Sequence, residues 1–151
     1  MTTIAWDGKV IAADSQYTYE SEAGGNRKHR CPKLFRKETK DGRNVIIATQ
    51  GDGSAGLVFL DWFGSGKKPP AVITHHLPDF TCLVWSKAGL LEYDAYCRPY
   101  KIELPFYAIG SGANVALGAM KFGATAAQAV ETAIEFDAYT MGPVVEMVLE
   151  Q

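Results

Sequence analysis

Apolar and polar residues alternate in short runs along the first half of the chain, and turn segments separate these runs. A period of two residues is typical of half-buried β-strands, and Asp-Gly between two such runs predicts a tight hairpin. Asp7-Gly8, Asp41-Gly42 and Lys87–Gly89 occupy the turn positions. The pattern predicts hairpins with the strand pairs Thr2–Trp6 and Lys9–Ala13, Lys33–Lys37 and Asn44–Thr49, and Thr81–Ser86 and Leu90–Tyr96.

Helical periods and two further strands complete the expected elements, while the polar, Gly-rich segment Glu20–Arg30 predicts a loop. Thr125 stands where a helix N-cap is expected. Because strands outnumber crossover helices, the order favours an α+β fold of antiparallel sheets with segregated helices. A length of 151 residues favours a single domain over 1–151. The remaining elements are helices over Ser54–Phe63, Asn114–Phe122 and Thr125–Asp137, and strands over Phe106–Ile109 and Val144–Leu149.

The composition is that of an ordinary globular protein, with 47% hydrophobic and 21% charged residues. A formal net charge of -2 gives no electrostatic reason to expect a nucleic-acid or membrane partner, and the basic cluster Arg27–Arg30 is interpreted as part of a solvated loop. No apolar run approaches the roughly 20 residues of a membrane helix, and the N-terminus does not resemble a signal peptide. Three scattered cysteines indicate idle thiols in a reducing cytoplasm and no zinc site.

The start of the chain offers a candidate nucleophile. Initiator methionine is commonly removed before a small residue, so Thr2 would carry a free α-amine once Met1 is gone. That amine titrates near ~7.7–8.0 and could accept the proton of the Thr2 hydroxyl, which is a poor nucleophile by itself. The alternative is that Met-Thr is an ordinary beginning with no chemical role.

Two further residues could support such a nucleophile. Asp14 closes the strand that pairs with the first one, so its side chain is expected near the N-terminus. Lys33 begins the next hairpin, and a cation beside Thr2 would lower the pKa of the hydroxyl while Asp14 held the ammonium in place. Spacing alone favours the ordinary interpretation, with Asp14 as a turn residue and Lys33 as an exposed lysine after Pro32.

Several segments, in matching order over most of the chain, resemble motifs of the proteasome β-type family of N-terminal-nucleophile hydrolases. The closest similarity is to the bacterial HslV peptidases, whose Ala-Ile-Gly-Ser-Gly motif resembles the segment beginning at Ala108. Order and spacing together carry the resemblance. The segments are Thr2–Ala5, Val10–Gln16, Lys33–Arg36, Ala108–Asn114 and Asp137–Gly142.

The resemblance implies a four-layer αββα sandwich with its site at one end of the sheets. It implies that Thr2 is the nucleophile and, through its α-amine, the base, with Asp14 and Lys33 as the supporting pair. No metal and no organic cofactor is needed for this chemistry. The residues expected around the amine are Ser111, Asp137 and Thr140, the last standing where the family usually has Ser.

Gly51 matches the family glycine whose amide donates to the oxyanion, and Gly53 is the alternative. The same region suggests a competing function, because Gly51–Gly56 fits the G-x-G-x-x-G pattern of dinucleotide sites between a strand and a helix. That pattern also requires an acidic residue at the end of the following strand. Thr81–Ser86 ends without one, and hairpins precede the glycines, so nucleotide binding is the weaker hypothesis.

The leading hypothesis is therefore a cytoplasmic threonine peptidase that forms a homo-oligomer, either a ring or a helical array, and cleaves unfolded proteins or peptides. An ATPase unfoldase partner is expected by resemblance to HslV. The apolar stretch Leu57–Phe63 exceeds one helix face, so Trp62 or Phe63 is expected to contact a neighbour. The alternative is a catalytically silent structural or interaction protein with the same fold, which retention of Met1 would favour. The short, Pro- and Gly-rich stretch Phe63–Phe80 departs from the longer helical region of the family.

Overall fold

The computed structural model describes residues 2–20 and 26–150, and the chain divides into two compact units. The first unit combines the N-terminal segment Met1–Lys33 with Pro105–Val148. The second contains Leu34–Leu104 and the last residues, Leu149–Gln151. Both are built from antiparallel strands and helices, which confirms the α+β class. The expectation of a single domain stays a prediction.

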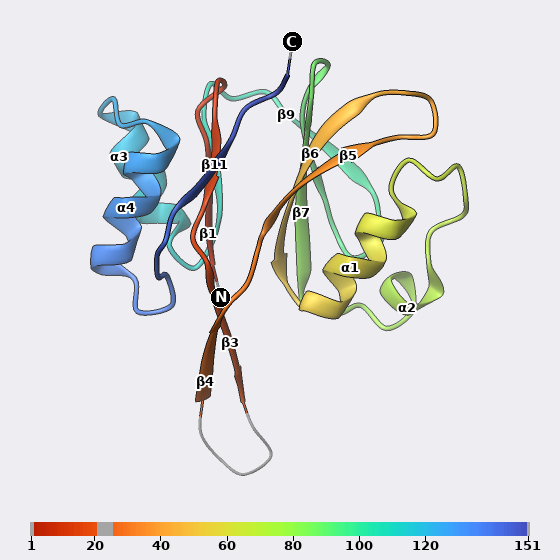
Figure 1. Ribbon diagram of the computed structural model, residues 1–151, viewed down its shortest axis with the longest axis horizontal. Coiled ribbons are helices and arrows are strands. Elements are labelled where there is room, and N and C mark those ends of the chain that lie inside the picture. The colour runs from red at the N-terminus through yellow and green to blue at the C-terminus, as the bar shows by residue number, and fades with distance from the viewer. Residues whose placement is uncertain (1, 21–25, 151) are drawn as a thin grey trace. The chain divides into compact units, whose positions relative to one another are not determined.

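The first unit contains a four-stranded antiparallel sheet in the order β10-β1-β2-β11, with two helices against one face (Figure 1). Asp7-Gly8 forms the predicted turn between β1 and β2, where Asp7 N–H donates to the Val10 carbonyl and Gly8 has φ +89°. The elements are β1 (Thr3–Trp6), β2 (Ile11–Ala13), β10 (Tyr107–Gly110), β11 (Val145–Met147), α3 (Ala113–Lys121) and α4 (Ala126–Phe136).

A row of alanines lets the helices approach this sheet closely. Ala5 pairs with Ala12 on one side and with Ala108 on the other, so the three methyl groups share one face. They pack with Ala116, Met120, Ala126, Ala129 and Val130 of the helices. Thr125 caps α4 as predicted, in a reciprocal capping box with Gln128. The caps and the small side chains fix the helices beside the N-terminal strand.

The predicted loop Glu20–Arg30 is wrong over the residues that the structure describes. Strands β3 (Gln16–Glu20) and β4 (Asn26–Arg30) pair as an antiparallel hairpin, with Gln16 opposite Arg30 (Figure 1). The basic cluster therefore belongs to a strand, although His29 and Arg30 are exposed as expected for charged side chains. Backbone pairing with β3 holds β4 in place, although the sequence of β4 has no apolar residue from which a strand could be predicted.

The second unit contains a five-stranded antiparallel sheet in the order β5-β6-β7-β8-β9. The turn at Asp41-Gly42 and the buried strand around Val45–Ala48 are confirmed. A short helix, α2, and a strand, β9, were not expected, because each is a brief segment beside Pro residues. The elements are β5 (Leu34–Glu38), β6 (Asn44–Gly51), α1 (Gly53–Trp62), α2 (Ala71–Thr74), β7 (Phe80–Ser86), β8 (Gly89–Tyr93) and β9 (Pro99–Ile102).

An aromatic cluster around Phe59 fills the core of this unit and corrects the expectation for α1. Phe63 is buried, and Trp62 is half-buried with its indole N–H donating to the Lys67 carbonyl at 2.8 Å. Both rings lie 6.5 Å or less from their aromatic neighbours. The side chain left outside is instead Leu57, which is 60% exposed. The expectation is therefore wrong for Phe63, whereas a contact of Trp62 with a neighbouring subunit stays a prediction.

Candidate functional site

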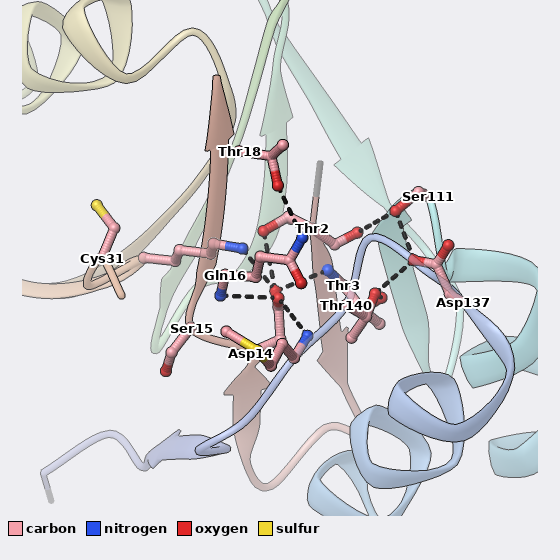
Figure 2. A network of polar contacts seen from close by, with 12 residues as sticks. Thr2, Thr3, Asp14, Ser15, Gln16, Thr18, Cys31, Ser111, Asp137 and Thr140 are labelled. Carbon is pink, nitrogen blue, oxygen red and sulfur yellow. Dashed lines mark hydrogen bonds and ion pairs between the residues drawn. The ribbon is translucent and has the colours of Figure 1, made fainter. Parts of the chain in front are cut away.

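The buried carboxylate of Asp14 gathers the N-terminal residues of the first unit (Figure 2). Asp14 directly follows β2, and its N–H donates to the Thr3 carbonyl at 3.1 Å, which continues the pairing of β1 with β2. Its Oδ1 accepts hydrogen bonds from Thr2 Oγ1 at 2.9 Å and from the Thr3 N–H at 2.9 Å. The Lys33 ammonium reaches the same oxygen at 2.7 Å.

The second oxygen of Asp14 orients the carboxylate. Oδ2 accepts from the Gln16 N–H at 3.1 Å and from the Met141 N–H at 3.2 Å. The neighbouring residue Ser15 adds a backbone hydrogen bond to the same segment, since its N–H donates to the Met141 carbonyl at 2.9 Å. A carboxylate with donors on both oxygens has little freedom to rotate, so Oδ1 stays directed at Thr2 and Lys33.

Lys33 is the cation of the site, and its side chain is only 7% exposed. Burial lowers the pKa of the Lys33 ammonium, while the charge of Asp14 and the hydrogen bond to it oppose that shift and do not cancel it. Lys33 follows β4 and Pro32 and directly precedes β5, so the end of the hairpin delivers it. The expected juxtaposition of Thr2, Asp14 and Lys33 is found.

A second carboxylate lies on the other side of the N-terminus. Asp137 ends α4, and its Oδ2 accepts from Ser111 Oγ at 2.6 Å and from Thr140 Oγ1 at 2.5 Å (Figure 2). Burial favours the neutral acid, but these two hydrogen bonds prevail and lower the pKa of Asp137. Ser111 Oγ also lies 3.3 Å from the Thr2 carbonyl oxygen. The three residues expected around the amine are therefore joined through the Asp137 carboxylate, and Ser111 lies next to Thr2.

The Thr2 backbone needs glycine on the neighbouring strand. Gly110 has φ +100°, and a Cβ placed there would lie 1.9 Å from the Thr2 carbonyl oxygen. No larger residue fits without displacing Thr2. The glycine that precedes Ser111 in the sequence motif thus has a direct steric reason.

Gly51 and Gly53 lie in the second unit, at the end of β6 and the start of α1. Gly51 has φ +96°, and a Cβ there would lie 2.2 Å from the Asp79 carbonyl oxygen, so its identity has a structural explanation. The proposed role of either glycine as oxyanion donor stays a prediction.

The glycine fingerprint lacks the environment of a dinucleotide site. Strand β6 lies between β5 and β7 and is antiparallel to both, whereas the fingerprint belongs to a parallel βαβ unit. At the N-terminus of α1, the Asp52 carboxylate accepts from the Ala55 N–H at 2.7 Å. A carboxylate already lies where a phosphate would bind, which disfavours the nucleotide hypothesis.

Two kinds of feature are absent from residues 2–20 and 26–150: grouped metal ligands and helices of membrane-spanning length. In this part of the chain no group of three or more His, Cys, Asp and Glu side chains is placed to hold a metal ion. No helix there combines the length and apolarity that crossing a bilayer requires. Cys82 and Cys97 are buried free thiols, and Cys31 is a half-buried one.

Sequence reasoning missed two residues that the site uses. Thr3 contributes its hydroxyl as well as its backbone, and Gln16 is a buried residue beside Asp14 whose side-chain amide donates to Thr18 Oγ1 at 2.7 Å. Thr3 sits in a strand, where β-branched residues are ordinary, and therefore gave no separate signal. Gln16 closes the motif segment Val10–Gln16, which assigns no role to its side chain.

No protein-family model and no curated protein matches this chain, but solved structures share its fold. Thiobacillus denitrificans BPH in complex with epoxomicin superposes with a TM-score of 0.66 at 23% identity, over 99% of this chain and 97% of the other. HslV from Trypanosoma brucei gives 0.69 at 18% identity, over 99% of both chains. A Gly-1 mutant of Anbu from Hyphomicrobium sp. strain MC1 gives 0.67 at 12% identity, over 99% and 82%.

These superpositions cover nearly the whole chain, so the chain has the fold of the proteasome-type N-terminal-nucleophile hydrolases. Sequence identities of 12–23% show a shared fold but do not show a shared chemistry. The likeness to HslV in particular is modest, at 18% identity.

Proposed function

We propose that the chain is the threonine peptidase subunit of a self-compartmentalising, proteasome-like assembly, with Thr2 as nucleophile after removal of Met1. One observation carries the proposal: Thr2 Oγ1 and Lys33 Nζ both bond the same buried oxygen of Asp14, at 2.9 and 2.7 Å. A hydroxyl and a buried cation held on one acceptor form the arrangement that a threonine nucleophile needs.

The chemistry requires a base, which removal of Met1 would create. The neutral α-amine of Thr2 takes the hydroxyl proton as Oγ1 attacks the peptide carbonyl carbon. Lys33 stabilises the negative charge on Oγ1, and Asp14 holds Lys33 in place. The amine then gives its proton to the leaving nitrogen, and water hydrolyses the resulting ester to release the second product and regenerate Thr2.

The second carboxylate has a role in this scheme. Ser111 and Thr140 donate to Asp137, so that carboxylate is ionised at neutral pH and can attract the α-ammonium form. Ser111 Oγ is close enough to the Thr2 backbone to contact it directly. In the proposed reaction these groups orient the amine, and the amide of Gly51, or alternatively Gly53, donates to the oxyanion.

The assembly and its surroundings follow from the same proposal. Enclosure in a homo-oligomeric ring or helical array would restrict cleavage to unfolded proteins and peptides in the cytoplasm, and an ATPase unfoldase would supply them. The alternative function is a catalytically silent structural or interaction protein. An intact mass that retains Met1 in all molecules would favour that alternative, because Thr2 would then have no free amine.

The test combines intact mass, labelling and turnover. Mass spectrometry first establishes that Met1 is absent, and a threonine-directed electrophile should then add one equivalent to the wild type and none to Thr2→Ala. Thr2→Ala should abolish peptide hydrolysis with an unchanged melting temperature, whereas Thr2→Ser should keep measurable activity because both reacting groups remain. Epoxomicin, which the Thiobacillus denitrificans BPH structure contains, is a suitable inhibitor to include. Full activity in a trimmed Thr2→Ala protein would refute the mechanism.

A further inference from the structure

Thr3 bonds the Asp14 carboxylate directly and reaches the Asp137 carboxylate through the Thr140 hydroxyl. Its backbone N–H donates to Asp14 Oδ1 at 2.9 Å, and its carbonyl accepts from the Asp14 N–H at 3.1 Å. Its side-chain oxygen lies 2.6 Å from Thr140 Oγ1. The residue is fully buried, with 0% exposure, so water does not compete for these bonds. Thr3 therefore links the cluster around Asp14 to the cluster around Asp137.

The direction of the hydroxyl bonds follows from proton counting. A hydroxyl has one proton to donate, and Thr140 gives its proton to the Asp137 carboxylate at 2.5 Å. Thr140 must then accept in its contact with Thr3, so Thr3 is the donor. The bonds run from Thr3 to Thr140 to Asp137, and each strengthens the next because donation into a hydroxyl polarises its own O–H.

The fold keeps space for this hydroxyl. Gly112 begins α3, and a Cβ at Gly112 would lie 2.1 Å from Thr3 Oγ1 and 3.2 Å from Thr140 Oγ1. The same Cβ would also meet the Ala133 methyl group of α4 at 2.9 Å. Absence of a side chain at position 112 thus leaves room for the pair of threonine oxygens.

We propose that Thr3 is a positioning residue, whose hydroxyl holds Thr140 and Asp137 in register with the nucleophilic residue immediately before it. The inference rests on the proposed function of Thr2. Asp14 fixes the Thr3 backbone while Thr140 fixes its side chain, so Thr3 is held through both parts of the residue. Loss of the Thr3 hydroxyl frees the Asp137 side of the site and leaves the Asp14 side intact.

Isosteric variants separate positioning from packing. Val has the shape of Thr without the hydroxyl, whereas Ser keeps the hydroxyl and loses a methyl group. Positioning predicts that Thr3→Val lowers kcat about tenfold with KM changed less than twofold, and that Thr3→Ser keeps most of the activity. If Thr3 served packing alone, Thr3→Ser would lose more activity than Thr3→Val. Thr140→Val should show a similar loss, and the double variant should lose no more than either single one.

Controls make the outcomes distinct. Thr132→Val removes a hydroxyl from the same unit that bonds only the Gln128 carbonyl within α4, at 2.8 Å, and should leave kcat unchanged. Melting temperatures and intact masses confirm that each variant is folded and trimmed. If the wild type is inactive, or if Thr2→Ala is active, the proposed function fails. If the wild type is active and Thr3→Val stays within twofold of it, or Thr3→Ser is impaired as strongly as Thr3→Val, the positioning role of Thr3 is refuted.

Discussion

Asn in place of Asp14 would remove the negative charge from the candidate site while preserving the shape of the side chain. The Asp14 carboxylate is 1% exposed and accepts hydrogen bonds on both oxygens. An Asn amide has one oxygen and an NH₂ group that cannot accept. The donors that now bond the carboxylate oxygen replaced by the NH₂ group would lose their acceptor. The buried Lys33 ammonium would also lose its counter-charge.

The magnitude follows from the burial of that pair. Removing one partner of a buried ion pair costs about 3–5 kcal/mol, since the remaining charge is uncompensated. For a chain of this length such a loss lowers the melting temperature by on the order of 10 °C. The loss is smaller than most of the range of total stability expected for a globular protein, roughly 5–15 kcal/mol, so the variant should still fold but with much less stability.

The loss should depend on pH in a defined direction. Burial already lowers the pKa of Lys33, and without Asp14, which raises it, the pKa falls further. A lysine whose pKa in the folded state lies below its unfolded value of about 10.4 destabilises the folded state while it is protonated. That penalty is relieved as the pH rises from the folded-state pKa toward the unfolded-state pKa. The stability gap between wild type and Asp14→Asn should therefore narrow between pH 7 and pH 9.5.

Urea unfolding followed by circular dichroism at both pH values measures the effect. Asp41→Asn is the matched control, because the Asp41–Arg43 ion pair, at 2.9 Å, is exposed and should contribute far less. Equal losses in the two variants would contradict the assignment of Asp14 as the central buried charge. A gap that widens with pH would contradict the charged state of Lys33.

Two further predictions concern Lys33 and assembly. Lys33→Met should lower peptide hydrolysis on the order of a hundredfold or more, and Lys33→Arg should be no better, because a planar guanidinium does not replace an ammonium. Lys33→Met should also destabilise the protein less than Asp14→Asn, since Asp14 keeps its other donors. Activity assays and urea unfolding measure these two effects, and an active Lys33→Met variant would contradict the role of Lys33. Light scattering at micromolar concentration should detect a homo-oligomer, and a clean 16.4 kDa monomer would contradict the proposed assembly.

The sequence predicted best those elements whose signal is local. Asp7-Gly8 forces a turn through the positive φ of Gly8, and Thr125 caps α4 through its own side chain and that of Gln128. Both depend on a few neighbouring residues. Because the turn at Gly8 fixes how β1 and β2 pair, the position of Asp14 beside the N-terminus was also predictable.

Features that depend on distant contacts were not predictable in the same way. Strand β4 consists of polar and charged residues only, so it resembles a loop until its backbone pairing with β3 is known. Leu57 and Phe59 are both apolar residues of α1, and only the packing of the helix buries one and exposes the other. The Thr3 hydroxyl finds its partner across a separation of 137 residues, a relation that no local pattern contains.

The arrangement at Asp14 Oδ1 has a consequence for how the hydroxyl is activated. Thr2, Thr3 and Lys33 all donate to this oxygen, yet a carboxylate oxygen offers about two lone-pair sites, so the donors compete. In the proposed reaction Thr2 Oγ1 stops donating once it loses its proton, so the Thr3 N–H and the Lys33 ammonium are the donors left on this oxygen and the competition is relieved. We therefore propose that Asp14 supports deprotonated Thr2 by holding Lys33 in place, although in the resting site it accepts the hydrogen bond of the Thr2 hydroxyl.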